Sequence, residues 1–228
     1  MRPTLLALCA VLALAGCGGG SDAAPTASKP APARGVCQKV AAPAPKGEQN
    51  LEKPTAALAA GKRYDVELQT NCGTITIRLA TGRAPKTAAS FADLVKRGFY
   101  DGLTFHRIAH DFVIQGGDPL GTGLGGPGYT VVEKPPGNLA YTTGVVAMAK
   151  TEADPPGASG SQFFIVTAPD AQLPPDYAVV GGVVRGMDVA QRIGKLAVDG
   201  QDRPMSPVVL EKATLRTGRG GSGARRRG

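Results

Sequence analysis

The sequence predicts a mainly β fold, a closed antiparallel barrel whose ends are capped by two α-helices. Three observations lead to this prediction: two neighbouring segments alternate apolar and polar residues, several later runs are short and rich in β-forming residues, and only two segments have helical spacing. Gly and Pro separate the short runs, which is typical of closed all-β architectures. With 228 residues and a hydrophobic content of 42%, the chain is long enough for a domain of about 150 residues with terminal extensions.

The individual elements follow from local patterns. Residues 64–69 and 74–79 alternate apolar and polar side chains, and residues 71–73 between them supply turn chemistry, so a β-hairpin is expected. A first helix is expected to open at Pro85 and to end near Gly98, which stands where a C-terminal cap is expected. The other expected elements are a second helix at 187–196 and short strands at 145–149, 163–166, 178–184 and 208–215.

The N-terminus is predicted to be a secretory leader. Arg2 precedes an apolar run over residues 5–15, which is too short to span a bilayer and fits the h-region of a signal peptide. The Leu-Ala-Gly-Cys segment that ends at Cys17 resembles the lipobox of bacterial lipoproteins, in which the cysteine is acylated and becomes the new N-terminus. Residues 1–16 are therefore predicted to be a lipoprotein signal peptide, and Cys17 to anchor the chain to a bacterial membrane. Cleavage at the A-x-A site ending at Ala15 is the alternative, and it would give a secreted protein.

Residues 17–60 are predicted to be the lipidated cysteine and a flexible tether. Residues 18–35 contain fourteen Gly, Ala, Pro or Ser and no Leu, Ile, Val or Phe, so burial there cannot offset the entropy of ordering. Within the rest of the tether, residues 36–60 contain Leu51 and Leu58, which could pack back onto the domain. The folded domain is predicted to span residues 61–217.

The net charge of +8 does not indicate a nucleic-acid partner. Arg2 lies in the leader, and Arg219 and three further arginines lie in the Gly-rich residues 218–228, which are predicted to be a disordered basic tail. Removing these five from the net charge of +8 leaves +3, an ordinary surface. A domain that reads phosphates needs its basic residues clustered on folded structure, so no nucleic-acid binding is expected. Weak attraction of the tail to anionic polymers or lipid is the functional alternative.

The cysteines are expected to provide a disulfide rather than a metal site. Cys9 leaves with the leader and Cys17 is lipidated, so Cys37 and Cys72 remain as an even pair in an oxidising compartment. A bridge between them is favoured, and two unpaired thiols are the alternative. Two thiols without a nearby histidine do not form a zinc site, and no metal is expected.

Three segments resemble the cyclophilin family of peptidyl-prolyl cis-trans isomerases. They are Phe-His-Arg at 105–107, Phe-Val-Ile-Gln-Gly-Gly-Asp at 112–118 and Gly-Ser-Gln-Phe-Phe-Ile at 160–165. The similarity runs from Tyr64 to Leu215 with supporting pieces in the family's order. It implies an eight-stranded antiparallel barrel with two capping helices and a shallow groove that takes a prolyl peptide.

The resemblance also implies roles for particular residues. They are the catalytic Arg107, the proline-pocket walls Phe112, Val113, Phe164 and Leu173, the backbone-binding Gln115 and Gln162, and the groove-lining Ala149 and Lys150. Tyr177, which is also expected to bind substrate, stands where the family usually has a histidine. The alternatives are a surface ion pair for Arg107, ordinary core for Phe112 and Phe164, and solvated amides for Gln115 and Gln162. Gln172 stands where the family commonly has an aromatic residue that helps to hold cyclosporin, so only weak cyclosporin binding is expected.

The residue types fit this chemistry independently. An arginine stays protonated and presents several donors to a prolyl nitrogen, while apolar walls hold the ring. No proton transfer is needed, so no cofactor is expected. The function predicted is a monomeric isomerase that acts on proline-containing, unfolded or extended polypeptides outside the cytoplasm and assists their folding. The alternative is a non-catalytic chaperone or scaffold lipoprotein that binds proline-containing segments.

Two further patterns are rejected as sites. Residues 121–126 satisfy G-x-G-x-x-G, but Pro127 follows and no helix is expected there to receive a phosphate, so a flexible loop is predicted. His106 and His110 are four residues apart, which suits a metal on a helix, but their segment is expected to be strand and turn, so their side chains should diverge.

Overall fold

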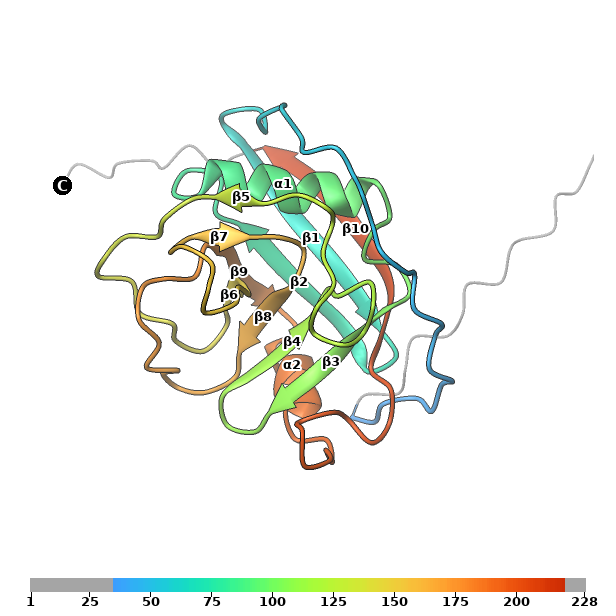
Figure 1. The fold of residues 1–228 in the computed structure, drawn as a ribbon. Coiled ribbons are helices and arrows are strands. Elements are labelled where there is room, and N and C mark those ends of the chain that lie inside the picture. The colour runs from blue at the N-terminus through green and yellow to red at the C-terminus, as the bar shows by residue number, and fades with distance from the viewer. Residues whose placement is uncertain (1–34, 220–228) are drawn as a thin grey trace, which may run out of the picture. The chain divides into compact units, whose positions relative to one another are not determined.

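The computed structural model describes residues 35–219, and its strands form a closed barrel (Figure 1). The barrel strands are β1 (Lys62–Thr70), β2 (Gly73–Leu79), β3 (Leu103–Ala109), β4 (Val113–Gly116), β6 (Val145–Met148), β8 (Phe163–Val166), β9 (Val179–Arg185) and β10 (Val209–Arg219). Their order around the barrel is β1, β10, β3, β4, β8, β6, β9 and β2, and all neighbours are antiparallel. The strands β5 (Val131–Val132) and β7 (Ala158–Ser159) form a separate two-stranded sheet.

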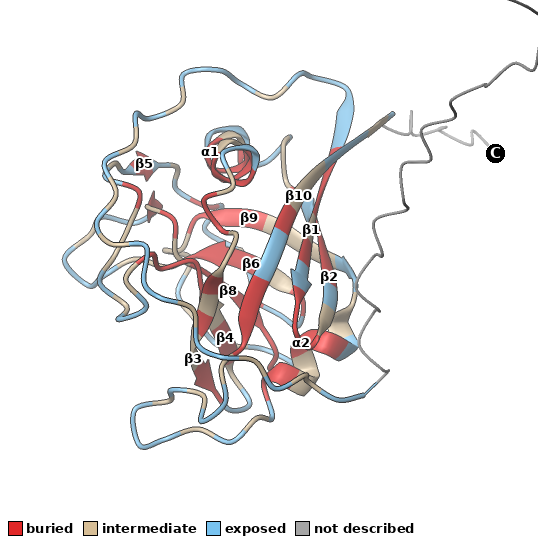
Figure 2. Cartoon of the chain, turned by 90° about the vertical axis from the view of Figure 1, so that its right-hand side faces the viewer, coloured by how far each residue is buried: buried red, intermediate tan, exposed pale blue. Residues whose placement is uncertain are grey.

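The two helices are α1 (Pro85–Lys96) and α2 (Met187–Ile193), and they lie at opposite ends of the barrel in Figures 1 and 2. The predicted fold class, a mainly β barrel of eight antiparallel strands capped by two helices, is therefore confirmed. α2 is shorter than the predicted 187–196, because Gly194 forms its C-terminal cap before the apolar spacing ends at Leu196.

The first hairpin has the predicted turn. β1 and β2 pair from Asp65 opposite Arg78 to Thr70 opposite Gly73. β10 extends further than the predicted strand at 208–215, because its backbone stays paired with β1 as far as Arg219. Backbone pairing does not require alternating apolar side chains, so the sequence pattern ends before the strand does. The basic tail, predicted to begin at residue 218, therefore starts two residues too early, because β10 runs to Arg219.

The start of α1 is stabilised by a carboxylate from a distant segment. Ala84 at the N-cap position makes no side-chain hydrogen bond, and Pro85 occupies the first turn, where its missing N–H is not needed. Glu133 accepts the backbone N–H groups of Lys86 at 3.1 Å and of Thr87 at 2.7 Å. A negative charge beside free N–H groups at a helix N-terminus is favourable, so Glu133 provides the missing cap.

The end of α1 follows the predicted cap. Gly98 has φ 67°, a left-handed conformation that glycine adopts without a steric penalty. Its N–H donates to Val95 O, and the N–H of Phe99 donates to Leu94 O, both at 3.0 Å. These two bonds are the Schellman arrangement, and both Phe99 and Leu94 lie in the apolar core.

The main apolar core fills the barrel and the space under α1. Figure 2 shows buried residues concentrated on the barrel strands and α1, whereas the surrounding loops are mostly exposed or intermediate. Within this core the ring of Phe163 packs edge-on against Phe91 at 5.4 Å and against Tyr100 at 5.6 Å. Such T-shaped pairs add to the stabilisation that burial provides.

Residues 36–60 lie along the barrel from the α2 end to the α1 end (blue to cyan in Figure 1), and we call them the N-terminal strap. The backbone N–H groups of Lys46 and Leu51 donate to Pro119 O and Pro127 O, both at 2.8 Å. Leu51 and Leu58 also pack against the main core, as the sequence allowed. The flexible tether predicted to reach residue 60 is thus corrected, because these contacts and the backbone hydrogen bonds hold the strap. Such bonds leave no trace in hydrophobic periodicity.

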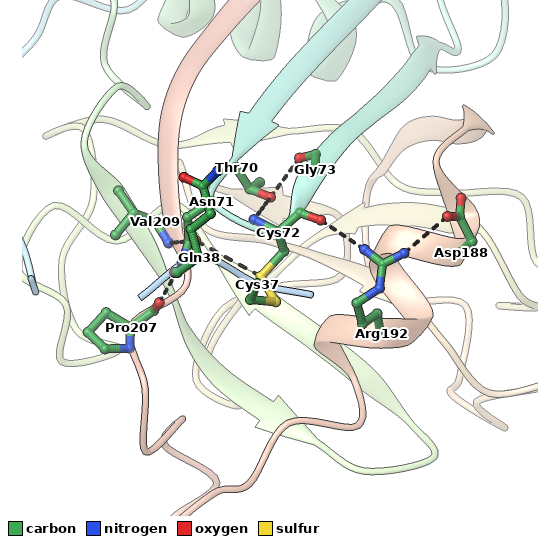
Figure 3. The surroundings of a disulfide bond; sticks show 10 residues. All are labelled: Cys37, Gln38, Thr70, Asn71, Cys72, Gly73, Asp188, Arg192, Pro207 and Val209. Atoms are coloured by element: carbon green, nitrogen blue, oxygen red, sulfur yellow. Dashed lines mark hydrogen bonds and ion pairs between the residues drawn. A yellow bond between two sulfur atoms is a disulfide. The ribbon is translucent and has the colours of Figure 1, made fainter. Parts of the chain in front are cut away.

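A disulfide joins the strap to the β1–β2 turn. Cys37 and Cys72 are bonded, with their Cα atoms 4.0 Å apart (Figure 3). Beside the bridge, Gln38 N–H donates to Asn71 O at 2.8 Å, and Asn71 Nδ2 donates back to Gln38 O at 2.7 Å. Arg192 of α2 donates to Cys72 O at 2.8 Å. The favoured cysteine pairing is thus present in the structure, and it fixes the strap near α2.

Several predictions concern residues outside the described part. The signal peptide, the lipidation site Cys17 and most of the basic tail lie in 1–34 and 220–228. Within residues 35–219, no helix is long and apolar enough to cross a membrane.

Candidate active site

Arg107 reaches the outer face of the barrel because of a bulge in β3. In the pairing of β3 with β4, Phe105 lies opposite Gly116 and Arg107 lies opposite Gln115. Because Gln115 and Gly116 are neighbours in sequence, His106 is an extra residue on β3. Strict alternation would place Arg107 on the inner face with Phe105. The bulge instead leaves Phe105 and Ile108 in the core and turns Arg107 outward, as bulges beside functional sites commonly do.

Cross-strand pairing arranges the central site residues in one row. Arg107 on β3 pairs with Gln115 on β4, Gln115 pairs with Phe164 on β8, and Phe164 pairs with Ala147 on β6. Directly paired residues present their side chains on the same face of a sheet. The cation, the amide and the aromatic ring therefore lie side by side, whereas Phe163 faces the barrel core.

A second apolar cluster, which we call the outer cluster, lies apart from the barrel core. Its buried members are Ala109, Val113, Tyr141, Ala147, Phe164, Val166 and Ala168, and partly buried residues packed on it include Phe112, Ala149, Leu173 and Tyr177. All four predicted pocket walls and Tyr177 thus belong to one cluster. Its partly open apolar side chains are suited to holding a pyrrolidine ring.

Tyr141 supports the outer cluster from within. Its hydroxyl donates to Tyr177 O at 2.7 Å and accepts the Tyr177 N–H at 2.9 Å, and the Phe164 ring packs edge-on against Tyr177 at 5.5 Å. Burial raises the pKa of Tyr141 to about 12, so its hydroxyl keeps the proton that it donates. Nothing in the local sequence around Tyr141 indicated this role.

A cavity of about 390 Å³ adjoins the row of paired residues. Its lining includes the predicted Gln115, Ala149, Lys150 and Gln162 together with the Gly-rich segment at 123–128. Gln115 Nε2 donates to Gln162 Oε1 at 2.9 Å, and Gln162 Nε2 donates to the carbonyl oxygens of Gly123 and Gly125, also at 2.9 Å. The two amides are thereby oriented by each other and by the loop.

The loop that satisfies G-x-G-x-x-G is organised by a buried carboxylate. Asp118 accepts the N–H groups of Leu120 and Thr122 at 2.8 Å and that of Gly123. These are the backbone donors that a phosphate would need, and no helix begins there. The segment 121–126 is therefore not a phosphate site, and its residues 123–126 line the cavity.

The cavity and the outer cluster meet at Lys150. Its ammonium donates to Thr151 O and Asp154 O, both at 3.2 Å, and lies 5.7 Å from the centroid of the Tyr177 ring. This is within range for a cation–π interaction. Lys150 therefore places a positive charge at the boundary between the outer cluster and the cavity.

Arg107 does not line the cavity, and it has an ion-pair partner. Its Nη2 donates to Asp202 Oδ2 at 3.0 Å, with the two side chains 39% and 42% exposed. Among residues 35–219 no further hydrogen bond to this guanidinium is found, so its other N–H groups remain free to donate to a bound peptide.

The two histidines diverge. Both ring nitrogens of His106 are buried without a hydrogen-bond partner, and burial lowers its pKa, an effect that Asp118 opposes and Arg107 reinforces. His110 instead bonds Leu196 O through Nε2 at 2.8 Å. In the described part of the chain, no group of three or more His, Cys, Asp or Glu could hold a metal ion.

The sequence model of the family described as "Cyclophilin type peptidyl-prolyl cis-trans isomerase/CLD" matches residues 65–215. This chain therefore belongs to the cyclophilin-type peptidyl-prolyl cis-trans isomerases, enzymes that accelerate rotation about the peptide bond before proline. The match begins within β1 at Asp65 and ends within β10 at Leu215.

Individual relatives agree with this assignment. The chain is 44% identical over 153 residues to peptidyl-prolyl cis-trans isomerase ppi1 of Schizosaccharomyces pombe, covering 65% of this chain and 97% of that protein. It is 40% identical to human peptidyl-prolyl cis-trans isomerase-like 1, covering 65% and 90%. A crystal structure of a Cryptosporidium parvum cyclophilin-type isomerase superimposes with a TM-score of 0.63 at 29% identity, covering 68% and 98%. A related structure of that protein was obtained in the presence of the dipeptide Ala-Pro.

The sequence did not identify three residues that shape the site. Tyr141 holds the backbone of Tyr177, Asp118 holds the Gly-rich loop, and Asp202 binds Arg107. Of these three residues, only Asp118 could have been identified from the sequence, because it ends the Phe-Val-Ile-Gln-Gly-Gly-Asp segment that carried the family resemblance.

Proposed function

We propose that this isomerase acts on extended or unfolded, proline-containing polypeptides outside the cytoplasm and assists their folding while a lipid on Cys17 tethers it to a bacterial membrane. We also propose that it works as a monomer. The observation that carries the catalytic part is the row in which Arg107 lies beside Gln115 and Phe164 on one face.

The reaction requires stabilisation of a twisted peptide bond. An X-Pro bond rotates over a barrier of ~20 kcal/mol because resonance gives the C–N bond partial double-bond character. When the bond twists, the prolyl nitrogen regains its lone pair and becomes a better hydrogen-bond acceptor. A catalyst must therefore offer a donor that binds the twisted state more strongly than the planar one.

Arg107 is suited to supply this donor. Its guanidinium remains protonated and holds several N–H groups in a planar fork. In our proposal the outer cluster holds the pyrrolidine ring, Gln115 and Gln162 bind the peptide backbone, and the N–H groups of Arg107 that Asp202 does not use donate to the prolyl nitrogen. A preorganised donor of this kind contributes about 10²- to 10³-fold in rate.

The cellular location is proposed from the N-terminal sequence together with the disulfide. Lipid chains on Cys17 would contribute about 0.8 kcal/mol for each buried methylene, which makes a two-chain anchor stable. The disulfide between Cys37 and Cys72 is of a kind that persists in oxidising compartments and is rare in the cytosol. Both features favour an extracytoplasmic enzyme.

The catalytic proposal is tested by a protease-coupled assay on a short X-Pro peptide with the wild type and Arg107→Ala. We expect kcat/KM to fall by about 10²- to 10³-fold with little change in peptide affinity. Arg216→Ala is the matched control, because Arg216 also forms an ion pair at 3.0 Å, with Glu67 on β1, but lies on β10. Equal inactivity of wild type and Arg107→Ala with retained peptide binding would favour the non-catalytic chaperone or scaffold instead.

The location is tested by the mass and fractionation of the mature protein. Acylation at Cys17 predicts an added lipid mass and recovery in the membrane fraction, and Cys17→Ala should release the chain into the soluble fraction. An unmodified, soluble wild type would support cleavage by ordinary signal peptidase and secretion.

We further propose weak cyclosporin binding. Gln172 is exposed, and its backbone has φ 52°, so the position that carries an aromatic residue in many relatives here offers a polar side chain. Inhibition of the purified protein at nanomolar cyclosporin would contradict this proposal.

A further inference from the structure

Asp202 contacts two successive residues of β3. Its carboxylate accepts from Arg107 Nη2 at 3.0 Å, and its carbonyl oxygen accepts the backbone N–H of Ile108 at 2.8 Å. Because the second contact is made by the backbone, the position of the carboxylate relative to Arg107 is set by how the loop docks on β3.

The loop that carries Asp202, residues 197–205, is itself closely held. Val198 and Pro204 form an isolated β-bridge that closes it. Asp199 accepts the N–H groups of Gln201 at 2.8 Å and Arg203 at 3.0 Å through its carboxylate. These hydrogen bonds also lower the pKa of the Asp199 carboxyl, so it stays ionised and keeps both contacts. The loop is therefore a stiff support for the residue at its tip.

The backbone of Asp202 has φ 62°, and it is one of three non-glycine residues with positive φ in the described chain. Aspartate tolerates this left-handed conformation better than most residues, but glycine adopts it with less strain. Because glycine would fit this backbone with less strain, the conformation by itself does not require an aspartate at position 202.

A contribution of the Asp202–Arg107 ion pair to folding stability does not explain why an aspartate stands at position 202. The two partners are 39% and 42% exposed, and ion pairs between exposed side chains contribute little to folding because water and salt screen them. The contact does restrict a long side chain with several rotatable bonds, and it engages one terminal nitrogen while leaving the other N–H groups free.

We propose that Asp202 is a positioning residue for catalysis: it holds the Arg107 guanidinium in the orientation that donates to the twisted prolyl nitrogen. The proposal depends on Arg107 being the catalytic group. Asp202 acts through Arg107 alone, so its removal lowers kcat and leaves the binding of the planar substrate nearly unchanged.

The test compares Asp202→Gly with the wild type in the peptide assay. Glycine suits φ 62°, so this variant keeps the loop backbone and removes only the carboxylate. We expect kcat to fall about 5- to 20-fold, since small misplacements of a catalytic group reduce rates by up to about 10²-fold, while KM changes less than twofold. Asp202→Asn keeps a carbonyl oxygen that can accept from Arg107, and it should lose less than Asp202→Gly.

Asp111→Gly is the matched control. Asp111 is also an aspartate with positive φ, 53°, but it lies in the turn between β3 and β4, and no contact with Arg107 is found. This variant should retain wild-type kcat. Urea unfolding midpoints of all variants establish that differences in kcat do not arise from loss of the fold.

The decisive measurement adds Asp202→Gly to Arg107→Ala. A residue that acts only through Arg107 has no further effect on kcat in that background, whereas a general structural effect would be repeated there. An unchanged or increased kcat in Asp202→Gly alone, or an equal fall in both backgrounds, would overturn the proposal. If Arg107→Ala itself retained full activity, the assignment of the catalytic group would fail instead.

Discussion

The disulfide between Cys37 and Cys72 should account for a large part of the stability of the chain. The two cysteines are 35 residues apart. In the chain-entropy description, opening a loop of this length restores about 12.7 cal/mol/K to the unfolded chain, which is about 3.8 kcal/mol at 25 °C. This is comparable with the whole stability of a marginal domain, so reduction should be readily measured.

The perturbation is reduction of the wild type in denaturant followed by equilibrium urea unfolding in the presence of reductant. With an m-value of about 2 kcal/mol/M, the midpoint should fall by about 2 M. The variant carrying Cys37→Ala and Cys72→Ala provides the control, because its midpoint should be as low as that of the reduced wild type and should not respond to reductant. Alanine is preferred to serine because Cys72 is 2% exposed and lies in the apolar core.

A midpoint shift of less than about 0.5 M on reduction would refute this reasoning. In that case either the reduced unfolded chain would stay as compact as the bridged one, or the strap would undock from the reduced folded protein, which would then gain the same entropy as the unfolded chain. Hydrogen exchange at the Leu51 amide would distinguish these cases, because that amide is bonded to Pro127 O only while the strap is docked.

Two further predictions concern His106 and Glu133. Burial lowers the pKa of His106 below its ordinary value of 6.5, so the unfolded chain takes up a proton more readily than the folded one as the pH falls below 6.5, and stability is lost there. His106→Gln should therefore flatten the fall in urea midpoint between pH 7.5 and 5.5, and an unaltered slope would show that other groups cause it. Glu133→Ala removes the acceptor of two N–H groups at the start of α1 and should lower the unfolding free energy by about 1 to 2 kcal/mol. Glu133→Gln, which keeps one amide oxygen, should lose less, and equal stability of all three proteins would contradict the capping role.

The fold was predictable because its signals are local. Alternation over residues 64–69 and 74–79 identified the β1–β2 hairpin, and Pro85 and Gly98 marked both ends of α1. Errors arose where a local signal and the backbone pairing end at different residues. β10 continues past its apolar residues because β1 still pairs with it, and α2 ends at Gly194 although apolar spacing continues.

The sequence named the candidate site residues but could not predict their arrangement in space. The predicted residues fall into the outer cluster, the cavity wall and the cross-strand row. The bulge at His106 could not be foreseen, because inserting a residue in a strand changes the side that every later side chain faces without changing the composition. The docking of the strap was indicated only by Leu51 and Leu58, because the main-chain hydrogen bonds that also hold it do not depend on side-chain type.

The sequence by itself determined the class of fold, pointed to Arg107 as the candidate catalytic group through its surrounding motif, and supplied the pair of cysteines available for a bridge. Only the tertiary structure decided which face Arg107 occupies, which acid it meets, and where the strap lies. The physical reason is distance along the chain: Arg107 and Asp202 are 95 residues apart, and nothing in the local pattern of either segment records their contact. A strand's period of two and the glycine cap that ends α1 are encoded in neighbouring residues, whereas contacts such as that between Arg107 and Asp202 arise only when distant segments pack together.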